Sequence, residues 1–124
     1  MSHSRINLLV LRTSRIADVL AFYRAVGLTF VEEKHGTGPI HWSCERDGIV
    51  MEIYPGVEGV APGWKSGGAT MIGFSVASID SVMSSLAALR VEVVSAVKLG
   101  PMGKRAVILD PDGRAVDLTE PSRT

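Results

Sequence analysis

Residues 110–118 read DPDGRAVDL, a tight-turn sequence that runs into an alternating strand with an acid, Asp117, four residues after the glycine. Residues 47–53, DGIVMEI, repeat this arrangement with the same count, and here the acid is Glu52. Because side chains alternate between the two faces of a strand, the two acids are expected at matching positions on the second strands of two hairpins. The repeat therefore predicts a duplicated sheet and a site formed by corresponding strands.

The composition is typical of a soluble globular domain. Of the 124 residues, 46% are hydrophobic and 21% are charged, and the formal net charge is zero. The sequence has no run of Lys or Arg and no apolar stretch near the roughly 20 residues of a membrane span, so neither nucleic acid nor a membrane is expected as a partner. The single cysteine, Cys44, has no partner for an intrachain disulfide and favours a cytoplasmic location.

The helix pattern is duplicated as well as the hairpin. Apolar residues at helical spacing recur 63 positions later, and the two hairpin glycines recur after 65, namely Ile16 and Ile79, Val19 and Val82, Leu20 and Met83, Tyr23 and Leu86, then Gly48 and Gly113. A short insertion between two otherwise matching halves explains both spacings. Each half then reads β-α-β-β-β, with module 1 at about 5–55, a Gly- and Pro-rich linker at about 56–68 and module 2 at about 69–121.

In the first hairpin, Asp47-Gly48 is expected to be a two-residue turn. Counting outward from it sets Ser43 opposite Glu52 and His41 opposite Tyr54. These four side chains share one mixed, polar face. The opposite face is expected to be core, with Trp42, Cys44, Met51 and Ile53.

The second hairpin is counted across residues 110–113 in the same way. This count sets Ala106 opposite Asp117 and places Lys104 on the face of Asp117. The strand before it is expected at about 91–94, and the glycine-rich residues 100–103 are expected to form a lid over the site.

Taken together, these features resemble the vicinal oxygen chelate superfamily, the glyoxalase, bleomycin-resistance and extradiol dioxygenase group. The motifs that carry the resemblance are AFY at 21–23 with GL at 27–28, and DPDG at 110–113 followed by Asp117. The resemblance implies one α+β domain over 1–124, in which two paired βαβββ modules form a curved mixed sheet around a cavity. It also implies a small-molecule ligand and a homodimer.

For the metal-dependent members, the resemblance implies metal ligands on the first and last strands of each module. The last-strand positions fall on Glu52 and Asp117, whereas the first-strand positions fall on Leu8 and Met71, which cannot replace imidazoles. We therefore expect metal-independent recognition of a small molecule, with no cofactor. The alternative is a divalent metal held by Glu52, Asp117 and His41 in a lyase, isomerase or dioxygenase.

Glu52 and Asp117 are the candidate catalytic residues, because unpaired acids in the middle of a strand are costly in an ordinary core. The structural alternative is that each acid only pairs with a basic neighbour such as Lys104 or Arg12. The expected ligand-binding residues are Leu8, His41, Ser43, Tyr54, Met71 and Lys104, with Val10 and Gly73 completing the wall.

The remaining reactive side chains have ordinary explanations. His3 and His35 are expected to be solvated, Cys44 to be a buried small hydrophobe, and residues 22–23 to belong to the core. The residues do not decide whether the chain is an enzyme; if it is, the resemblance implies a glyoxalase-like lyase or an extradiol dioxygenase. A scaffold domain with an idle cavity is the third alternative.

Overall fold

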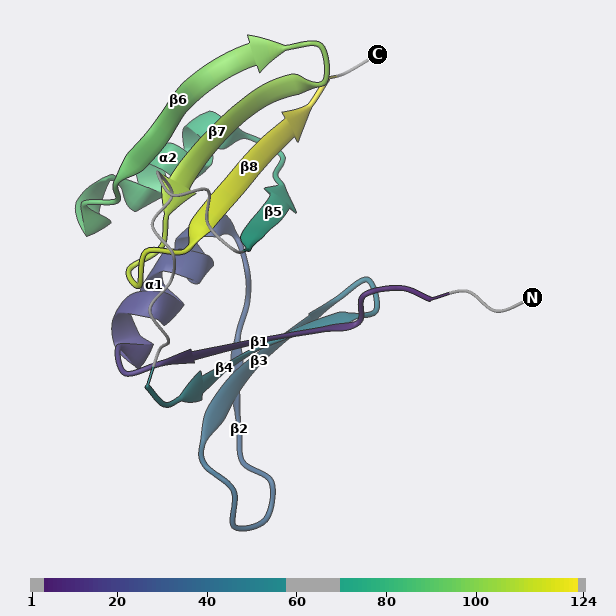
Figure 1. The fold of residues 1–124 in the computed structure, drawn as a ribbon, viewed down its shortest axis with the longest axis vertical. Helices are drawn as coiled ribbons and strands as arrows, with labels where there is room; N and C mark the ends of the chain where they lie inside the picture. Colours follow the sequence, from purple (N-terminus) through teal and green to yellow (C-terminus); the bar gives the residue numbers. More distant parts are fainter. Residues whose placement is uncertain (1–3, 58–69, 123–124) are drawn as a thin grey trace.

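The computed structural model describes residues 4–57 and 70–122, so most of the expected linker at 56–68, and also His3, lies outside the described residues. The chain order confirms two βαβββ modules (Figure 1). The elements are β1 (Leu8–Thr13), α1 (Ile16–Val26), β2 (Val31–Glu33), β3 (His41–Arg46), β4 (Ile49–Pro55), β5 (Met71–Ser75), α2 (Ile79–Leu86), the short 3-10 helix η2 (Ala87–Leu89), β6 (Val93–Gly100), β7 (Gly103–Leu109) and β8 (Ala115–Pro121).

Each module forms a four-stranded mixed sheet. The strand orders are β1-β4-β3-β2 and β5-β8-β7-β6, so the two halves share one topology. In both sheets the first strand of the module runs parallel to the last, and the remaining pairs are antiparallel. Figure 1 shows the first sheet in the lower part of the view and the second sheet above it. The α+β class and the duplicated architecture predicted from the sequence are confirmed.

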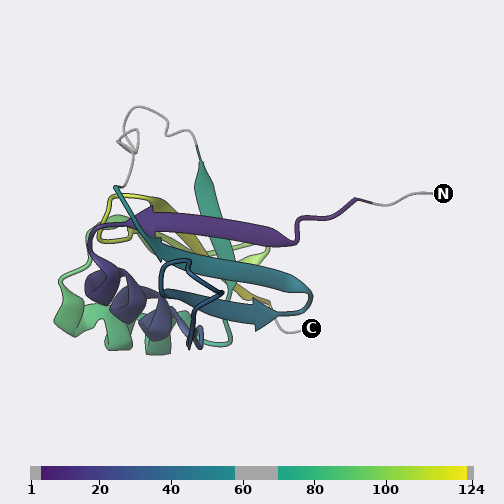
Figure 2. The same cartoon turned by 90° about the horizontal axis from the view of Figure 1, so that it is seen from below.

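The two helices pack against each other and cover one face of the sheets. Figure 2 shows them side by side along one flank of the molecule. Gly27, whose φ of 121° suits glycine, caps the C-terminus of α1, and Ser78 caps the N-terminus of α2, where its side chain accepts a hydrogen bond from Ser81 N. Among the described residues, neither helix has the length and apolar character needed to cross a membrane.

A single apolar core lies between the helices and the inner faces of both sheets. The helices contribute residues such as Phe22 and Tyr23, both fully buried, as expected from the sequence. The first sheet contributes Cys44, Met51 and Ile53, with Trp42 packed at the margin, which confirms the predicted core face of the first hairpin. Side chains alternate, so the residues between them point to the sheet face that the helices leave uncovered.

The first hairpin has the predicted turn and register. Asp47 and Gly48 both have positive φ, 55° and 81°, as a two-residue turn between twisted strands requires. Arg46 pairs with Ile49 and Ser43 pairs with Glu52. The dipeptide therefore places the first candidate acid as the sequence indicates.

The second hairpin differs from the prediction by one residue. Leu109 pairs with Ala115, so residues 110–114 form the connection, and Asp117 lies opposite Val107 rather than Ala106. A slip of one residue moves a side chain to the other face of the sheet. The prediction that Lys104 shares the face of Asp117 is therefore wrong. Its Nζ lies 3.4 Å from Asp80 Oδ2 on α2.

The expected lid is shorter than predicted. Strand β6 continues to Gly100, which pairs with Gly103, so only Pro101 and Met102 connect β6 to β7. The sequence suggested a loop because of its glycines, but the pairing of β6 with β7 overrides that local preference. The side chains at this tip, Leu99 and Met102, are 81% and 80% exposed.

A buried carboxylate, that of Asp110, joins the two modules. Its Oδ2 accepts hydrogen bonds from Tyr23 Oη at 2.6 Å and from Arg114 Nη1 at 3.0 Å. Its Oδ1 accepts from the backbone N–H groups of Asp112 and Arg114. Arg114 also donates to Arg12 O, at the end of β1. The DPDG motif thus anchors the second hairpin to the first module.

This network changes the pKa values of its members. Burial raises the pKa of Tyr23 well above 10, and the nearby charge and hydrogen bond of Asp110 raise it further. Burial acts to lower the pKa of Arg114, but the hydrogen bond to Asp110 and its charge outweigh burial and raise it. The phenol therefore remains a donor and the guanidinium a cation over the whole physiological range.

We expect Tyr23→Phe to lower the free energy of unfolding by about 1–3 kcal/mol near neutral pH, because a buried Asp110 oxygen loses a donor. A raised folded-state pKa means that the contribution of Tyr23 is complete below its ordinary pKa of about 10 and is lost as pH rises through the folded-state value. The gap between wild type and variant should therefore shrink above about pH 10. Urea unfolding at neutral and alkaline pH measures it.

Tyr54→Phe is the matched control, since it removes the same hydroxyl group from a tyrosine that stacks on His41 and takes no part in the Asp110 network. This account of the network is contradicted if wild type and Tyr23→Phe have the same free energy of unfolding near neutral pH. It is also contradicted if their difference in free energy persists unchanged in strong alkali.

Candidate functional site

The uncovered face of the first sheet brings together four of the residues predicted for the site. His41 Nε2 lies 3.3 Å from Glu52 Oε2, and Ser43 is the cross-strand neighbour of Glu52. The Tyr54 ring stacks on the imidazole with a centroid separation of 4.3 Å and an interplanar angle of 7°. The hairpin register inferred from the sequence put His41 and Glu52 roughly 7 Å apart along the strand. The two side chains extend toward each other, so His41 Nε2 and Glu52 Oε2 lie much closer than this separation along the strand.

His41 is buried although it points to the uncovered face. Only 2% of its surface is exposed: the Tyr54 ring stacks on the imidazole, and the ring of His35, from the loop between β2 and β3, also lies near it. Its Nδ1 lies 3.3 Å from Pro39 O. Its Nε2 is buried and has no hydrogen-bond partner among the described residues, which is unusual for a buried polar atom.

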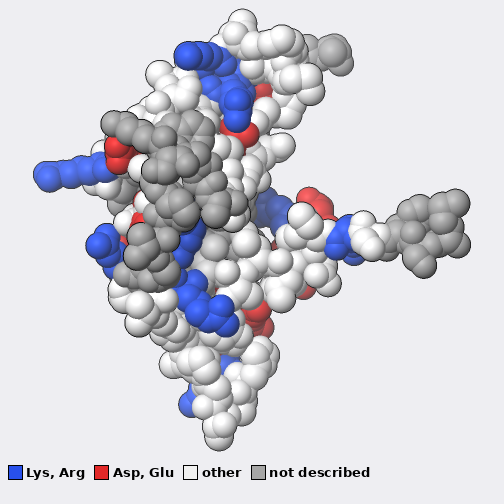
Figure 3. All heavy atoms as spheres, viewed as in Figure 1, with Lys and Arg blue, Asp and Glu red and all other residues white. Residues whose placement is uncertain are grey.

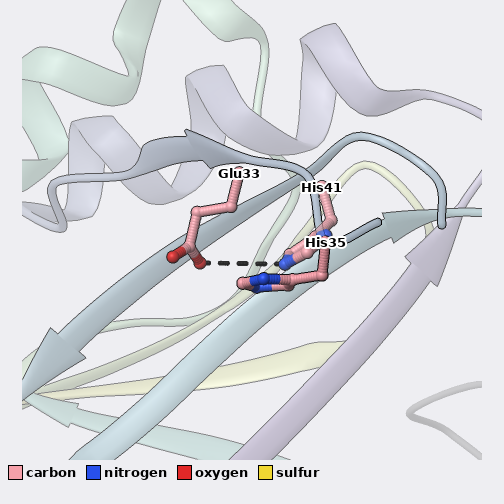
Figure 4. Close-up of side chains that lie close together, drawn as sticks. All are labelled: Glu33, His35 and His41. Atoms are coloured by element: carbon pink, nitrogen blue, oxygen red, sulfur yellow. Dashed lines mark ion pairs between the residues drawn. The ribbon is translucent and has the colours of Figure 1, made fainter. Parts of the chain in front are cut away.

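Two further residues join this group that the sequence did not single out. Glu33 Oε1 lies 3.7 Å from His41 Nε2, and the ring of His35 lies 5.1 Å from that of His41. Figure 4 shows the three side chains pointing toward one another from β2, the following loop and β3. One ligand atom from each lies within 4.8 Å of the others, so these residues form a group that can hold a metal ion.

The expectation that His35 is only solvated overlooked this convergence. Strand β2 spans Val31–Glu33, so that Glu33 pairs directly with His41. The available signal was the pair of histidines flanking the short glycine-rich loop, because two strands joined by such a loop bring its ends together.

The neighbouring first strand supplies apolar side chains to the same face. Val10 is the parallel partner of Glu52. Leu8, two residues before Val10 and on the same face, is 51% exposed. Val31, opposite Ser43, is 62% exposed. The polar centre at His41 and Glu52 is thus bordered by exposed apolar surface.

The second candidate acid lies on the other sheet with a partner of its own. Arg105 Nε donates to Asp117 Oδ1 at 2.8 Å. Gly73 is the parallel partner of Asp117. Met71, two residues before Gly73 and on the same face, is 39% exposed. The acid is therefore paired with a basic residue, as the structural alternative anticipated, but the base is Arg105 because of the shifted register. No described contact joins Asp117 to Glu52.

A groove of about 700 Å³ lies over the second sheet. Its lining combines apolar and basic side chains, including Leu99, Met102, Arg105 and Val107. A smaller pocket of about 430 Å³ lies between the start of α1 and the DPDG turn. Arg15 in that pocket already donates to Pro111 O, so we assign this pocket to the junction between the modules. On the face seen in Figure 3, basic and acidic side chains are interspersed.

The residues at the metal positions of the resembling family do not fit a metal. Leu8 and Met71 offer a hydrocarbon and a thioether, which are unsuitable for a hard divalent ion. Of the two acids at those positions, Asp117 is already neutralised by Arg105, and Glu52 is drawn toward His41. No reaction step is derived through a metal at these positions.

Comparisons with known proteins agree with this architecture. The family model for the Glyoxalase/Bleomycin resistance protein/Dioxygenase superfamily matches residues 5–118. No curated protein sequence matches the chain.

Several solved structures share the fold. TnmS3, an antibiotic binding protein from Streptomyces sp. CB03234, is 22% identical, with 98% of this chain and 99% of that chain covered and a TM-score of 0.67. A glyoxalase-related enzyme from Fulvimarina pelagi is 17% identical, with 95% and 88% covered and a TM-score of 0.70. A glyoxylase/bleomycin resistance protein/dioxygenase domain from Frankia sp. EAN1pec is 17% identical, with 98% and 100% covered and a TM-score of 0.71.

At these identities the solved structures show a common fold and nothing finer. The family model, in contrast, spans both modules and both motifs from which the resemblance was inferred. The chain belongs to the glyoxalase, bleomycin-resistance and dioxygenase superfamily.

Proposed function

We propose that this protein binds a small amphiphilic molecule on the uncovered faces of its sheets, without a metal at the Leu8 and Met71 positions. The observation that carries the proposal is the polar centre of His41 and Glu52, which is bordered by exposed Leu8 and Val31. An exposed apolar surface around a few convergent polar groups is typical of a ligand site.

The chemistry of this face favours a ligand with a cationic or hydroxyl-rich part and an apolar part. Glu33 and Glu52 supply negative charge, Ser43 and Tyr54 can form hydrogen bonds, and Leu8 offers apolar contact. The structural relative TnmS3 is described as an antibiotic binding protein, which supports a small-molecule ligand.

We expect a cationic aromatic compound to raise the melting temperature of wild type by roughly 3–6 °C per kcal/mol of binding free energy. Bleomycin and a panel of aromatic amines are the probes, and differential scanning fluorimetry in the presence of a chelator is the measurement. Leu8→Glu should abolish the shift, because it places a charge in the apolar border. Glu52→Gln should reduce it selectively for cations.

Val57→Glu is the matched control, because Val57 is 89% exposed and the substitution is of the same kind. If no compound of the panel shifts wild type, or if Leu8→Glu and Val57→Glu respond alike, ligand binding at this face is refuted and the scaffold alternative gains support.

A homodimer and a cytoplasmic location are further parts of the proposal. The exposed side chains at the β6–β7 tip, Leu99 and Met102, favour a partner surface, and the buried free thiol of Cys44 suits a reducing compartment. Sedimentation equilibrium of wild type should give twice the chain mass, and Leu99→Glu/Met102→Glu should shift the equilibrium toward monomer. A monomeric wild type at micromolar concentration would refute the dimer.

The second candidate function is a metal-dependent lyase, isomerase or dioxygenase. The observation that favours it is the approach of His41 to within 3.3 Å of Glu52, which gives the first module a mixed imidazole and carboxylate donor set. Asp117 is not part of this set in the chain, since it pairs with Arg105.

Turnover assays separate the two candidates. With added Fe²⁺, Mn²⁺ or Zn²⁺, the enzyme alternative expects turnover of a catechol with oxygen or of a 2-oxoaldehyde thiohemiacetal. Glu52→Gln should remove that turnover, because it removes one carboxylate donor, whereas Asp117→Asn should leave it in place. Equal inactivity of wild type and Glu52→Gln with every ion would leave binding as the function.

A further inference from the structure

We propose that the first module binds a divalent transition-metal ion of the zinc class through Glu33, His35 and His41. This site lies on β2, the loop after it and β3 of one module. Its three ligands are at none of the positions that the family uses, and Glu52, which faces the same nitrogen of His41, adds negative charge beside the site. It does not depend on the binding of an organic ligand.

The first argument is the orphaned nitrogen of His41. Because Pro39 O can only accept a hydrogen bond, the close Nδ1 must carry the proton, which leaves a lone pair on Nε2 in the neutral ring. That lone pair is buried and faces the oxygens of Glu33 and Glu52, which are also acceptors. A buried lone pair that faces two carboxylates and has no donor is stabilised by a cation beside it.

The hydrogen bond at Nδ1 is itself typical of a metal-ligating histidine. Such a ring commonly donates its other N–H to a backbone carbonyl, which fixes the tautomer and aims the free nitrogen at the ion. Here Pro39 O accepts that bond, and the stacked ring of Tyr54 restricts the rotation of the imidazole. His41 is thus oriented before any ion binds.

The second argument is distance. In a tetrahedral site with bonds of about 2.0–2.2 Å, neighbouring ligand atoms lie about 3.3–3.6 Å apart. The observed separation between His41 Nε2 and Glu33 Oε1 is 3.7 Å. This edge of the tetrahedron therefore has nearly the required length.

His35 completes the set from a segment that can adjust. Its side chain is exposed, and Gly36 and Gly38 follow it in the loop. Gly36 has a φ of 58°, which glycine adopts at little cost. The remaining ligand distances in the Glu33, His35 and His41 group are at most 4.8 Å, so a small movement of the exposed ring closes the site.

The donor set selects the class of ion. Two imidazoles and a carboxylate suit zinc and its transition-metal neighbours, whereas magnesium and calcium prefer oxygen ligands alone. The charges of Glu33 and of the nearby Glu52 favour a divalent cation. Figure 1 shows the β2–β3 loop at the end of the first sheet farthest from the second module, so one module supplies all three ligands.

The competing explanation is a doubly protonated His41 that forms ion pairs with Glu33 and Glu52. Against it, Nε2 has no hydrogen-bond partner even though Glu52 Oε2 is 3.3 Å away, so that oxygen is not in line with an N–H on the ring. This explanation also assigns no role to His35, which a metal site uses.

The test is calorimetric titration of the chelator-treated full chain with Zn²⁺. We expect one ion per chain, and His35→Ala and Glu33→Gln should each weaken binding by about tenfold or more, at least the loss seen for outer-shell partners of a metal. Glu32→Gln is the matched control, because Glu32 adjoins Glu33 on the opposite face of β2 and is exposed. His3→Ala controls for binding by the chain's other histidine.

A second measurement does not depend on affinity. Co²⁺ bound in the site should give the visible absorption of a tetrahedral ion, and His35→Ala should abolish it while the melting temperature of the metal-free protein stays unchanged. The exposed position of His35 makes that variant safe for folding.

The proposal is overturned if Zn²⁺ does not bind, as the ion-pair explanation requires, or if Glu33→Gln/His35→Ala binds as tightly as wild type. Neither result affects the proposed ligand binding, which is measured in chelator. Conversely, Leu8→Glu should abolish stabilisation by organic compounds and leave Zn²⁺ binding unchanged.

Discussion

The carboxylate of Asp110 is the constraint on which the arrangement of the two modules depends. It lies at the start of the DPDG turn, its side chain is fully buried, and it binds a tyrosine from α1, an arginine from its own turn and two backbone N–H groups. A buried charge is tolerated only when it is fully paired, so an arrangement of the modules that separated Asp110 from these partners would be costly. The role of the DPDG motif is therefore structural: it holds the two modules together.

The helices and this junction together decide which sheet faces are open. With α1 and α2 packed on each other over one shared core, the opposite faces of both sheets are left to carry polar and half-exposed side chains. Duplication gives the two faces matching positions, but the matching acids have diverged. Glu52 faces an imidazole, whereas Asp117 is neutralised by Arg105. The first module therefore carries an imidazole beside its acid, and the second offers a groove lined by apolar and basic side chains in which the acid is already paired.

Apart from Glu52, the positions at which members of the family hold a metal are not the places where the donor side chains of this chain gather. The first-strand positions carry apolar side chains, which suit contact with an organic ligand. Imidazole and carboxylate donors gather instead where β2 and β3 meet, around the buried ring of His41. The same fold can bind different ligands when its ligand-donating side chains are at different positions, because function depends on the site and not on the fold.

The sequence by itself determined what local chemistry controls: the duplication, the helices, the Asp47-Gly48 turn and the polar face with His41 and Glu52. Only the tertiary structure decided the register of the second hairpin, because Asp110 draws Arg114 into the turn and so turns Lys104 away from Asp117. It also decided that Glu33 and His35 meet His41, since strand pairing and loop closure are non-local. Residue propensities and the spacing of apolar residues specify the individual helices, strands and turns. The pairing of strands and of buried charges specifies which side chains come into contact.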